Sequence, residues 1–379
     1  MSVLKLQDKT VMEFDLSNGS FNVVNEPLLP VPLRNAIIDT STNNNYSTFV
    51  KNYQHLQNFF RNRYLSIKRE NAKKILNALH ISQSNDDDTL IKVMIMCKAL
   101  SITDDYWLTN DPDEKWENVN LRTNPLHETI SQIALYGNSP LTITGKIHTP
   151  ELTGQGAYAK AWKRENDMLY LYKAGTKNGN EAKIEASVSK ILDFTNVPHI
   201  KYKLLKENGK ILTKCRNMCN DNYSIVTAND IFSWCNRREI NFDEFVLSRD
   251  AENFYKTLIV DYLITNSDRH GQNWGFYMDN KSGEIKNMHP LFDHNNAFDE
   301  NEMKLKDGGE SLMMLGKSKR EAAQYAIKKC DFKIAENIPL DIFISKEHCE
   351  SFVNRAKDLK LKISVKKNYL KNIVNRIIR

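Results

Sequence analysis

The pattern of apolar and polar residues changes at about residue 140, and this change limits the folds that the chain can adopt. The segments "LTITGKIHT" (141–149), "MLYLYKAG" (168–175) and "HIKYKLLKENGKILTKC" (199–215) are strand-like, and Asn208-Gly209 is typical of a two-residue hairpin turn. From Ala228 onward, apolar residues recur at helical spacing. We therefore predict an α+β fold in which a small sheet-rich lobe, residues 140–219, precedes a helical lobe, residues 220–379.

Two helices stand out within these lobes. In "NEAKIEASVSKILD" (180–193), Ile184, Val188 and Ile191 share one helical stripe, which leaves Glu181 and Glu185 together on a neighbouring face. Residues 251–265 carry two rows of apolar side chains at four-residue spacing. The second helix is therefore expected to be apolar around most of its circumference and to lie centrally in the helical lobe.

Residues 1–139 are expected to form an accessory region. Short apolar runs around "SNG" predict a hairpin within residues 3–24, and the pattern between Phe49 and Leu108 is helical. The basic run "RNRYLSIKRENAKK" (61–74) leaves open a DNA-binding helical hairpin, although basic surface on a helical scaffold is the commoner case. The accessory region is therefore predicted to mix strands and helices.

The composition of the chain favours a folded globular protein over a largely disordered one. With 41% apolar and 26% charged residues, the chain is expected to fold as a globular protein. Its 53 Lys and Arg against 47 Asp and Glu give a net charge of +6, which suits a phosphate-bearing ligand without requiring nucleic acid. The scattered cysteines, the absence of a signal-like first segment and the absence of a long apolar run favour a cytoplasmic protein with no membrane attachment.

The basic side chains are concentrated near the C-terminus. Residues 359–379 contain seven lysines and arginines and no acidic residue. We interpret this stretch as the solvated face of a terminal helix, with Tyr369, Ile373, Val374 and Ile377 facing inward. A patch for an anionic partner is the alternative.

The runs "TNSDRHGQN" (265–273) and "PLFDHNNAF" (290–298) suit neither a helix nor a strand. The first follows the central helix, and the residues between the two runs read as a hairpin turned by "DNKSG" (279–283). A hairpin brings its ends together, so Asn273 and Asp293 are expected to be close in space. An amide and a carboxylate oxygen suit a divalent cation such as Mg²⁺, with Asp268 nearby to orient a hydroxyl group.

Magnesium bound in this way needs phosphate oxygens to complete its coordination, and the sheet-rich lobe offers groups to hold them. Gly154 and Gly156 in "TGQGAYAKAWK" (153–163) let backbone N–H groups approach a phosphate. Lys173 ends the strand "MLYLYK", and Glu185 on the following helix is placed to pair with it. Glu181, one helical turn away, is the alternative partner.

Together these motifs resemble the HipA-like serine/threonine kinase family, whose members are distant relatives of protein kinases and of phosphoinositide kinases. The resemblance rests on "GQGAYAKAWK", "LYLYKAG", "IEASVSKIL", "NSDRHGQN" and "PLFDHNNAF", with a weaker echo in "ALSITDDYWL" (99–108). It covers about residues 140–300. It implies a two-lobed, protein-kinase-like fold and transfer of phosphate from ATP, with Mg²⁺ as the metal.

The resemblance also implies roles for single residues. Asp268 would be the catalytic base, followed by Arg269 and His270 in the Asp-Arg-His order of the family, with the latter two either shaping the loop or contributing to catalysis. Asn273 and Asp293 would bind Mg²⁺. The residues expected to contact ATP are Gly154, Gly156, Lys160, Lys173, Glu185, Lys214, Cys215 and Met218, of which Lys173 would contact the phosphates and the segment 214–218 would join the lobes beside the adenine.

The sequence departs from the family pattern in its phosphate loop. Its hydroxyl groups belong to Thr153 and Tyr158, and the loop has no serine. Autophosphorylation of a loop serine, which the resemblance would otherwise imply, is therefore not expected here.

Several functions remain open at this stage. A protein substrate is expected, for which the resemblance suggests a translation factor, and an antitoxin partner chain would fit a HipA-like toxin. The alternatives are a lipid kinase of the phosphoinositide type, a non-catalytic pseudokinase or co-repressor, and a phosphohydrolase in which Asp268, His270, Asp293 and His294 hold a transition metal. Direct binding of nucleic acid is not expected.

Overall fold

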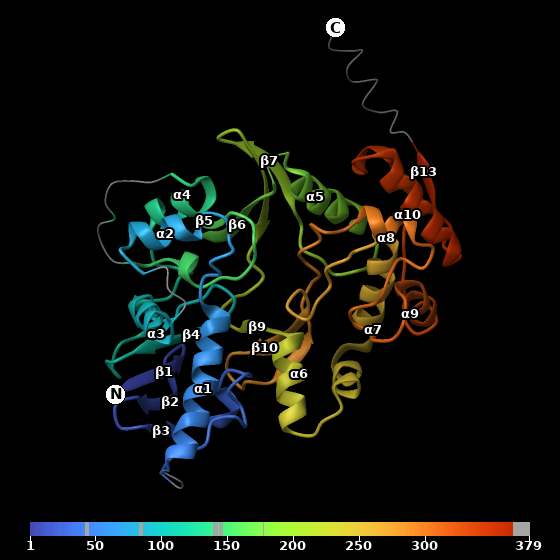
Figure 1. The fold of residues 1–379 in the computed structure, drawn as a ribbon. Coiled ribbons are helices and arrows are strands. Elements are labelled where there is room, and N and C mark those ends of the chain that lie inside the picture. Colours follow the sequence, from blue (N-terminus) through green and yellow to red (C-terminus); the bar gives the residue numbers. More distant parts are fainter. Residues whose placement is uncertain (42–44, 83–85, 139–142, 144–146, 177, 367–379) are drawn as a thin grey trace.

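The computed structural model describes residues 1–41, 45–82, 86–138, 143, 147–176 and 178–366 of the chain. Figure 1 shows the N-terminal sheet and helix α1 (Tyr46–Arg63) on one side and the late helices on the other. The strands β9 (Tyr223–Thr227) and β10 (Gly275–Asp279) lie between them. Strands and helices are both abundant in each half of the chain. The predicted α+β class is confirmed.

The chain opens with a four-stranded antiparallel sheet in the order β3-β2-β1-β4. The predicted turn at "SNG" joins β2 to β3. The fourth strand was not predicted, because it comes from a segment that we expected to be helical and pairs with β1 across about a hundred residues. The strands are β1 (Ser2–Leu6), β2 (Lys9–Asp15), β3 (Ser20–Val23) and β4 (Tyr106–Thr109).

Helices complete the accessory region, as the sequence predicts. Asn45 caps the first of them by accepting a hydrogen bond from the backbone N–H of Thr48 at 2.9 Å. The α-helices are α1 (Tyr46–Arg63), α2 (Ala72–Ala78), α3 (Asp87–Met96) and α4 (Glu128–Tyr136), and the 3-10 helices are η1 (Glu26–Leu28), η2 (Trp116–Asn118) and η3 (Pro150–Leu152).

The sheet-rich lobe contains a second antiparallel sheet in the order β5-β6-β8-β7. Asn208 and Gly209 both have positive φ, +48° and +75°, as the predicted hairpin turn requires. Helix α5 (Asn180–Leu192) lies against one face, and α4 contacts β5 and β6. The strands are β5 (Lys160–Glu165), β6 (Met168–Ala174), β7 (Lys203–Glu207) and β8 (Lys210–Arg216). The strand expected at 141–149 falls largely outside the described residues, and 147–149 are not in a strand.

The helical lobe is built on α6 (Ala228–Arg237) and the long α7 (Phe242–Leu263), whose second half is buried as predicted. The predicted hairpin after α7 consists of β10 (Gly275–Asp279) and β11 (Ile285–Met288). A third strand that we did not predict, β9 (Tyr223–Thr227), pairs with β10. This sheet fixes where the two polar loops on either side of the hairpin emerge.

The last part of the described chain packs on α7 and reaches α5 of the sheet-rich lobe through η4. Its elements are α8 (Glu300–Lys304), α9 (Lys319–Ala326), β12 (Asn337–Pro339), η4 (Leu340–Ile342), α10 (Lys346–Asp358) and β13 (Ser364–Lys366). The helix expected from residue 359 onward is wrong for the described residues 359–366, of which 364–366 pair with β12 in parallel. The remainder of that prediction, with Tyr369 and Ile373, lies outside the described residues.

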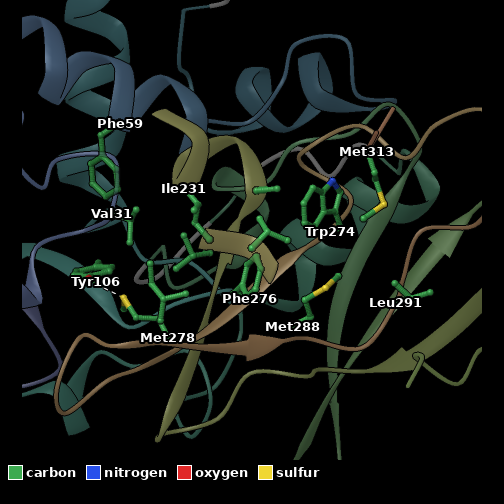
Figure 2. Packing of buried hydrophobic residues seen from close by; sticks show 14 of the residues in the cluster. Val31, Phe59, Tyr106, Ile231, Trp274, Phe276, Met278, Met288, Leu291 and Met313 are labelled. Carbon is green, nitrogen blue, oxygen red and sulfur yellow. Dashed lines mark hydrogen bonds between the residues drawn. The ribbon is translucent and has the colours of Figure 1, made fainter. Parts of the chain in front are cut away.

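One main hydrophobic core runs through all three parts of the chain. Figure 2 shows Trp274, Phe276 and Met278 along the hairpin region, with Tyr106 of β4 beside Met278. The hydroxyl group of Tyr106 donates to the carbonyl of Leu28 at 2.8 Å. The division at residues 139 and 219 stays a prediction, and the shared core crosses both boundaries.

Candidate active site

Lys173 lies at the centre of the candidate site. On β6 it is paired with Lys160 of β5 on one side and with Thr213 of β8 on the other. Its ammonium group contacts Glu185 at 3.3 Å and also the carboxylate of Asp293. Burial alone would lower the pKa of Lys173, but the charges of Asp293 and Glu185 outweigh it and raise that pKa above its ordinary value. Lys173 therefore stays a cation.

Glu185 is the buried partner of this lysine. Its side chain is only 1% exposed and accepts a hydrogen bond from the Thr213 hydroxyl group at 2.8 Å. Burial raises the pKa of Glu185, although Lys173 acts in the opposite direction. The alternative partner, Glu181, accepts instead from the backbone N–H and the hydroxyl group of Thr176, both at 2.8 Å. Of the two glutamates, only Glu185 pairs with Lys173 in the structure.

Asp268 is held in place from two directions while its carboxylate stays accessible. The amide of Asn296 donates to its carboxylate at 2.8 Å, and the amide of Asn273 donates to its backbone carbonyl at 2.8 Å. The side chain of Asp268 is 36% exposed. A carboxylate that is both fixed and open to solvent can accept a hydrogen bond from the hydroxyl group of a substrate and so orient it.

Arg269 lies beneath this loop. Its side chain is 1% exposed, forms an ion pair with Asp261 of α7 at 3.2 Å, and donates to the carbonyls of Asn273 and Phe292, each at 2.9 Å. These last two bonds tie the two polar loops together, which is the proximity that the hairpin predicts. The burial and bonds of Arg269 fit the loop-shaping role, and a catalytic role stays a prediction.

His270 is more exposed than Arg269. Its Nε2 lies 3.6 Å from a carboxylate oxygen of Asp268, and its Nδ1 accepts from the backbone N–H of Gln272 at 3.2 Å. The side chain is 46% exposed. These contacts fit the loop-shaping role and leave a catalytic role as a prediction.

Asn273 and Asp293 offer the oxygen donors expected for Mg²⁺. Because the amide nitrogen of Asn273 is bonded to Asp268, its amide oxygen is left as a ligand. Burial alone would raise the pKa of Asp293, but Lys173 overrides it and lowers that pKa, so the carboxylate is charged. Asp293 also has a φ of +55°, which Asp tolerates better than most residues. This donor set fits a hard cation.

The loop from Gly154 to Lys160 lies next to this cluster. Gly156 has a φ of +106°, a conformation that favours glycine, and the ring of Tyr158 lies 6.0 Å from the ammonium group of Lys173. The ammonium group of Lys160 donates to the carbonyl of Gln155. Burial and the neighbouring cations Arg69 and Lys173 lower the pKa of Lys160 to about 7. Thr153 is buried, with its hydroxyl group bonded to the carbonyl of Leu100.

The segment 214–218 fits the prediction only in part. Because side chains alternate along a strand, Lys214 faces away from Lys173, and its ammonium group contacts Glu165 and the ring of Tyr170 at 4.3 Å. The side chain of Lys214 thus lies on the other face of the sheet, and a contact between the segment 214–218 and the adenine stays a prediction. Cys215 is buried on the same face as Lys173, and burial raises its pKa. The carbonyl of Met218 accepts from Tyr277 at 3.5 Å.

Four residues that support the site were missed by the sequence analysis. Thr213 binds Glu185, Asn296 binds Asp268, Asp261 pairs with Arg269, and the hydroxyl group of Tyr202 accepts from the backbone N–H of Asp293 at 3.3 Å. Asn296 belongs to the run "PLFDHNNAF". Because the hairpin brings this run close to the run that bears Asp268, the contact between Asn296 and Asp268 could have been predicted from the sequence.

The alternative of a transition-metal site gains no support. Within the described ranges, no group of three or more His, Cys, Asp and Glu side chains is arranged to hold a metal ion. His294 is fully buried, and its Nδ1 accepts from Arg269 at 3.0 Å.

Of the helices described, none has both the length and the apolar character needed to cross a membrane.

A lysine and glutamate pair on a sheet-rich lobe, set against two aspartate-bearing loops of a helical lobe, defines a two-lobed, kinase-like α+β fold. Residues 211–377 match the model of the HipA-like C-terminal domain. The resemblance to the HipA-like family that the sequence motifs predict is thereby confirmed for these residues. No curated protein matches the chain.

The solved structures that are similar to this one include the following two. The first is the proinflammatory kinase CtkA of Helicobacter pylori, with 18% identity and a TM-score of 0.39 over 55% of this chain and 90% of that one. The second comes from the toxin–antitoxin complex of HipA, HipB and operator DNA of Shewanella oneidensis MR-1, with 13% identity and a TM-score of 0.47 over 95% of this chain and 96% of that one.

Proposed function

We propose that this protein is an ATP- and Mg²⁺-dependent protein kinase that transfers the γ-phosphate of ATP to serine or threonine. The observation that carries the proposal is the position of Lys173, which contacts Glu185 and Asp293 at once. Arg269 joins the loop of Asp293 to the loop that bears Asp268 by donating to the carbonyls of Phe292 and Asn273. Lysine, a metal-binding aspartate and a catalytic aspartate are the parts that phosphoryl transfer from ATP requires.

The residues of the chain divide the work of the reaction. Lys173 neutralises charge on the phosphates of ATP, and Glu185 holds its ammonium group in place. Asp268 orients the substrate hydroxyl group, whose oxygen forms the new bond to the γ-phosphorus while the bond to the ADP oxygen breaks. The hydroxyl proton passes to Asp268 or to solvent. Asn273 and Asp293 would hold Mg²⁺, which, when bound, offsets the negative charge of the phosphates.

Phosphate transfer from radiolabelled ATP tests this proposal. Asp268→Ala and, separately, Asp293→Ala should abolish transfer to a mixture of proteins and to the protein itself, while circular dichroism and the melting temperature show a folded chain. Full activity in either variant would contradict the assignment. Label that appears in phosphoinositide vesicles but not in protein would favour the lipid kinase instead.

The proposed biological role is that of a HipA-like toxin with a separate antitoxin chain, acting on a protein such as a translation factor. The match of residues 211–377 to the HipA-like C-terminal domain supports this role. Expression in a bacterium should slow growth, and Asp268→Ala should relieve the inhibition. If the variant inhibits growth as strongly as the parent, the effect does not depend on phosphate transfer, which would favour the non-catalytic alternative.

A further inference from the structure

The phosphate-binding loop rests on a short piece of the accessory region. We define the loop as residues 151–160 and the supporting segment as residues 61–70, which runs from the end of α1 toward α2. Backbone bonds join the two, from Leu65 N–H to the carbonyl of Leu152 at 2.9 Å and from Glu70 N–H to the carbonyl of Ala157 at 2.8 Å. The loop is thus attached near its start and in its second half to a part of the chain outside the two lobes.

A side chain of the loop adds to these contacts. The amide nitrogen of Gln155 donates to the carbonyls of Tyr64 at 2.7 Å and Asn62 at 3.2 Å. Gln155 lies between Gly154 and Gly156, so this contact fixes the middle of the glycine-rich turn. The carbonyl of Gln155 in turn accepts from the ammonium group of Lys160.

Arg69 is the main anchor of the supporting segment. Its guanidinium group is 1% exposed and forms an ion pair with Glu151, also 1% exposed, at 2.6 Å. The same group donates to the backbone carbonyl of Lys160. The other carboxylate oxygen of Glu151 accepts from the backbone N–H of Trp162 at 2.8 Å. Arg69 therefore binds the first and the last residue of the loop at once.

A buried charge of this kind needs a reason, because an ion pair in the interior often stabilises a fold no better than apolar side chains of the same size. Its directional bonds do fix geometry, however. Glycine-rich loops are flexible, and ordering such a loop when a ligand binds reduces affinity. A loop that is already held in shape binds its ligand without that cost.

We propose that Arg69 is a positioning residue for the nucleotide, and that the supporting segment 61–70 sets the affinity for Mg-ATP by holding the phosphate-binding loop in its binding shape. This inference rests on the proposed function and adds to it a role for the accessory region. It predicts that loss of Arg69 weakens nucleotide binding far more than it slows the transfer step, since Arg69 is remote from Asp268 along the chain and contacts neither Asp268 nor Lys173 among its described bonds.

The test compares full-length variants by calorimetry with Mg²⁺ and a non-hydrolysable ATP analogue, and by steady-state kinetics. Arg69→Met should raise Kd for the analogue and KM for ATP by tenfold or more, with kcat at saturating ATP within about twofold of the parent value. Arg69→Lys should restore part of the affinity. The matched control is Glu70→Gln, which removes only a surface ion pair to Lys210 at 3.1 Å and should leave Kd unchanged.

Arg69→Met leaves Glu151 buried without a cation, so a second variant guards against misfolding. Arg69→Met with Glu151→Met removes both charges, should keep the fold, and should show the same loss of affinity. Parent-like Kd in a folded Arg69 variant would overturn the inference and leave the kinase proposal standing. A parent protein that neither binds the analogue nor transfers phosphate would overturn both.

Discussion

Lys173 and Asp293 form a direct ion pair although 120 residues separate them in the chain. The first belongs to strand β6 of the sheet-rich lobe and the second to the loop that follows β11 of the helical lobe. Mg²⁺ bound to Asp293 would compete with Lys173 for the same carboxylate, which leads to a first prediction.

Lys173→Met should make the free protein more responsive to Mg²⁺. The substitution leaves Glu185 and Asp293 without their cation, and loss of one partner of a buried pair costs about 3–5 kcal/mol. Added MgCl₂ should therefore raise the melting temperature of the variant more than that of the parent. Lys214→Met, which removes a cation from the opposite face of the sheet, is the control, and an equal response of all three proteins would refute the prediction.

Asn296→Ala should lower kcat and leave KM for ATP nearly unchanged. Its amide holds the carboxylate of Asp268 at 2.8 Å, and hydrogen bonds to charged groups contribute about 1.5–3 kcal/mol. A loss of that size in the transition state corresponds to a fall in kcat of roughly ten- to a hundredfold. Steady-state kinetics would show it. A variant with unchanged kcat and raised KM would place Asn296 in nucleotide binding instead.

Arg269→Leu should destabilise the fold by about 3–5 kcal/mol, because the buried carboxylate of Asp261 would then lose its cation. The double variant with Asp261→Leu should recover much of the stability in urea denaturation. It should not recover activity, since the bonds from Arg269 to the carbonyls of Asn273 and Phe292 are lost in both variants. Recovery of activity in the double variant would show that Arg269 does not position the two loops.

Acid should weaken the fold through His289. Burial lowers the pKa of His289 to about 4, whereas an unfolded chain takes up this proton near 6.5. Between these values the unfolded state binds more protons, so stability is fully present above pH 6.5 and is lost as the pH falls toward 4. The loss from this group amounts to about 3 kcal/mol. His289→Gln should show a flatter pH profile of urea denaturation in that window, and an unchanged slope would contradict this.

Much of the site could be predicted because its signals are local. The strand that carries Lys173, the helix that carries Glu185 and the hairpin between Asn273 and Asp293 each have their own periodicity or turn residues, and the structure contains all three elements. The proximity of Asn273 and Asp293 follows from the hairpin between them. The roles of these residues stay predictions until activity is measured.

The rest depends on contacts between distant segments, which leave no local pattern. Strand β4 looked like part of a helical region, and only its pairing with β1 makes it a strand. The direction of Lys214 depends on the register of β6 and β8, and a shift of one residue reverses the face of every side chain. Nothing in the basic run 61–74 distinguishes Arg69 from its neighbours, because its buried partner, Glu151, lies 82 residues further along the chain.

Calorimetric titration with Mg²⁺ and a non-hydrolysable ATP analogue tests the central claim most directly, namely that Lys173, Asn273 and Asp293 surround one nucleotide. The account predicts binding of one nucleotide per chain to the parent and to Asp268→Asn, and a loss of at least tenfold in affinity for Lys173→Met and for Asp293→Asn. Unchanged affinity in both of the last two variants would show that the nucleotide, if it binds, does so elsewhere, and would contradict the account.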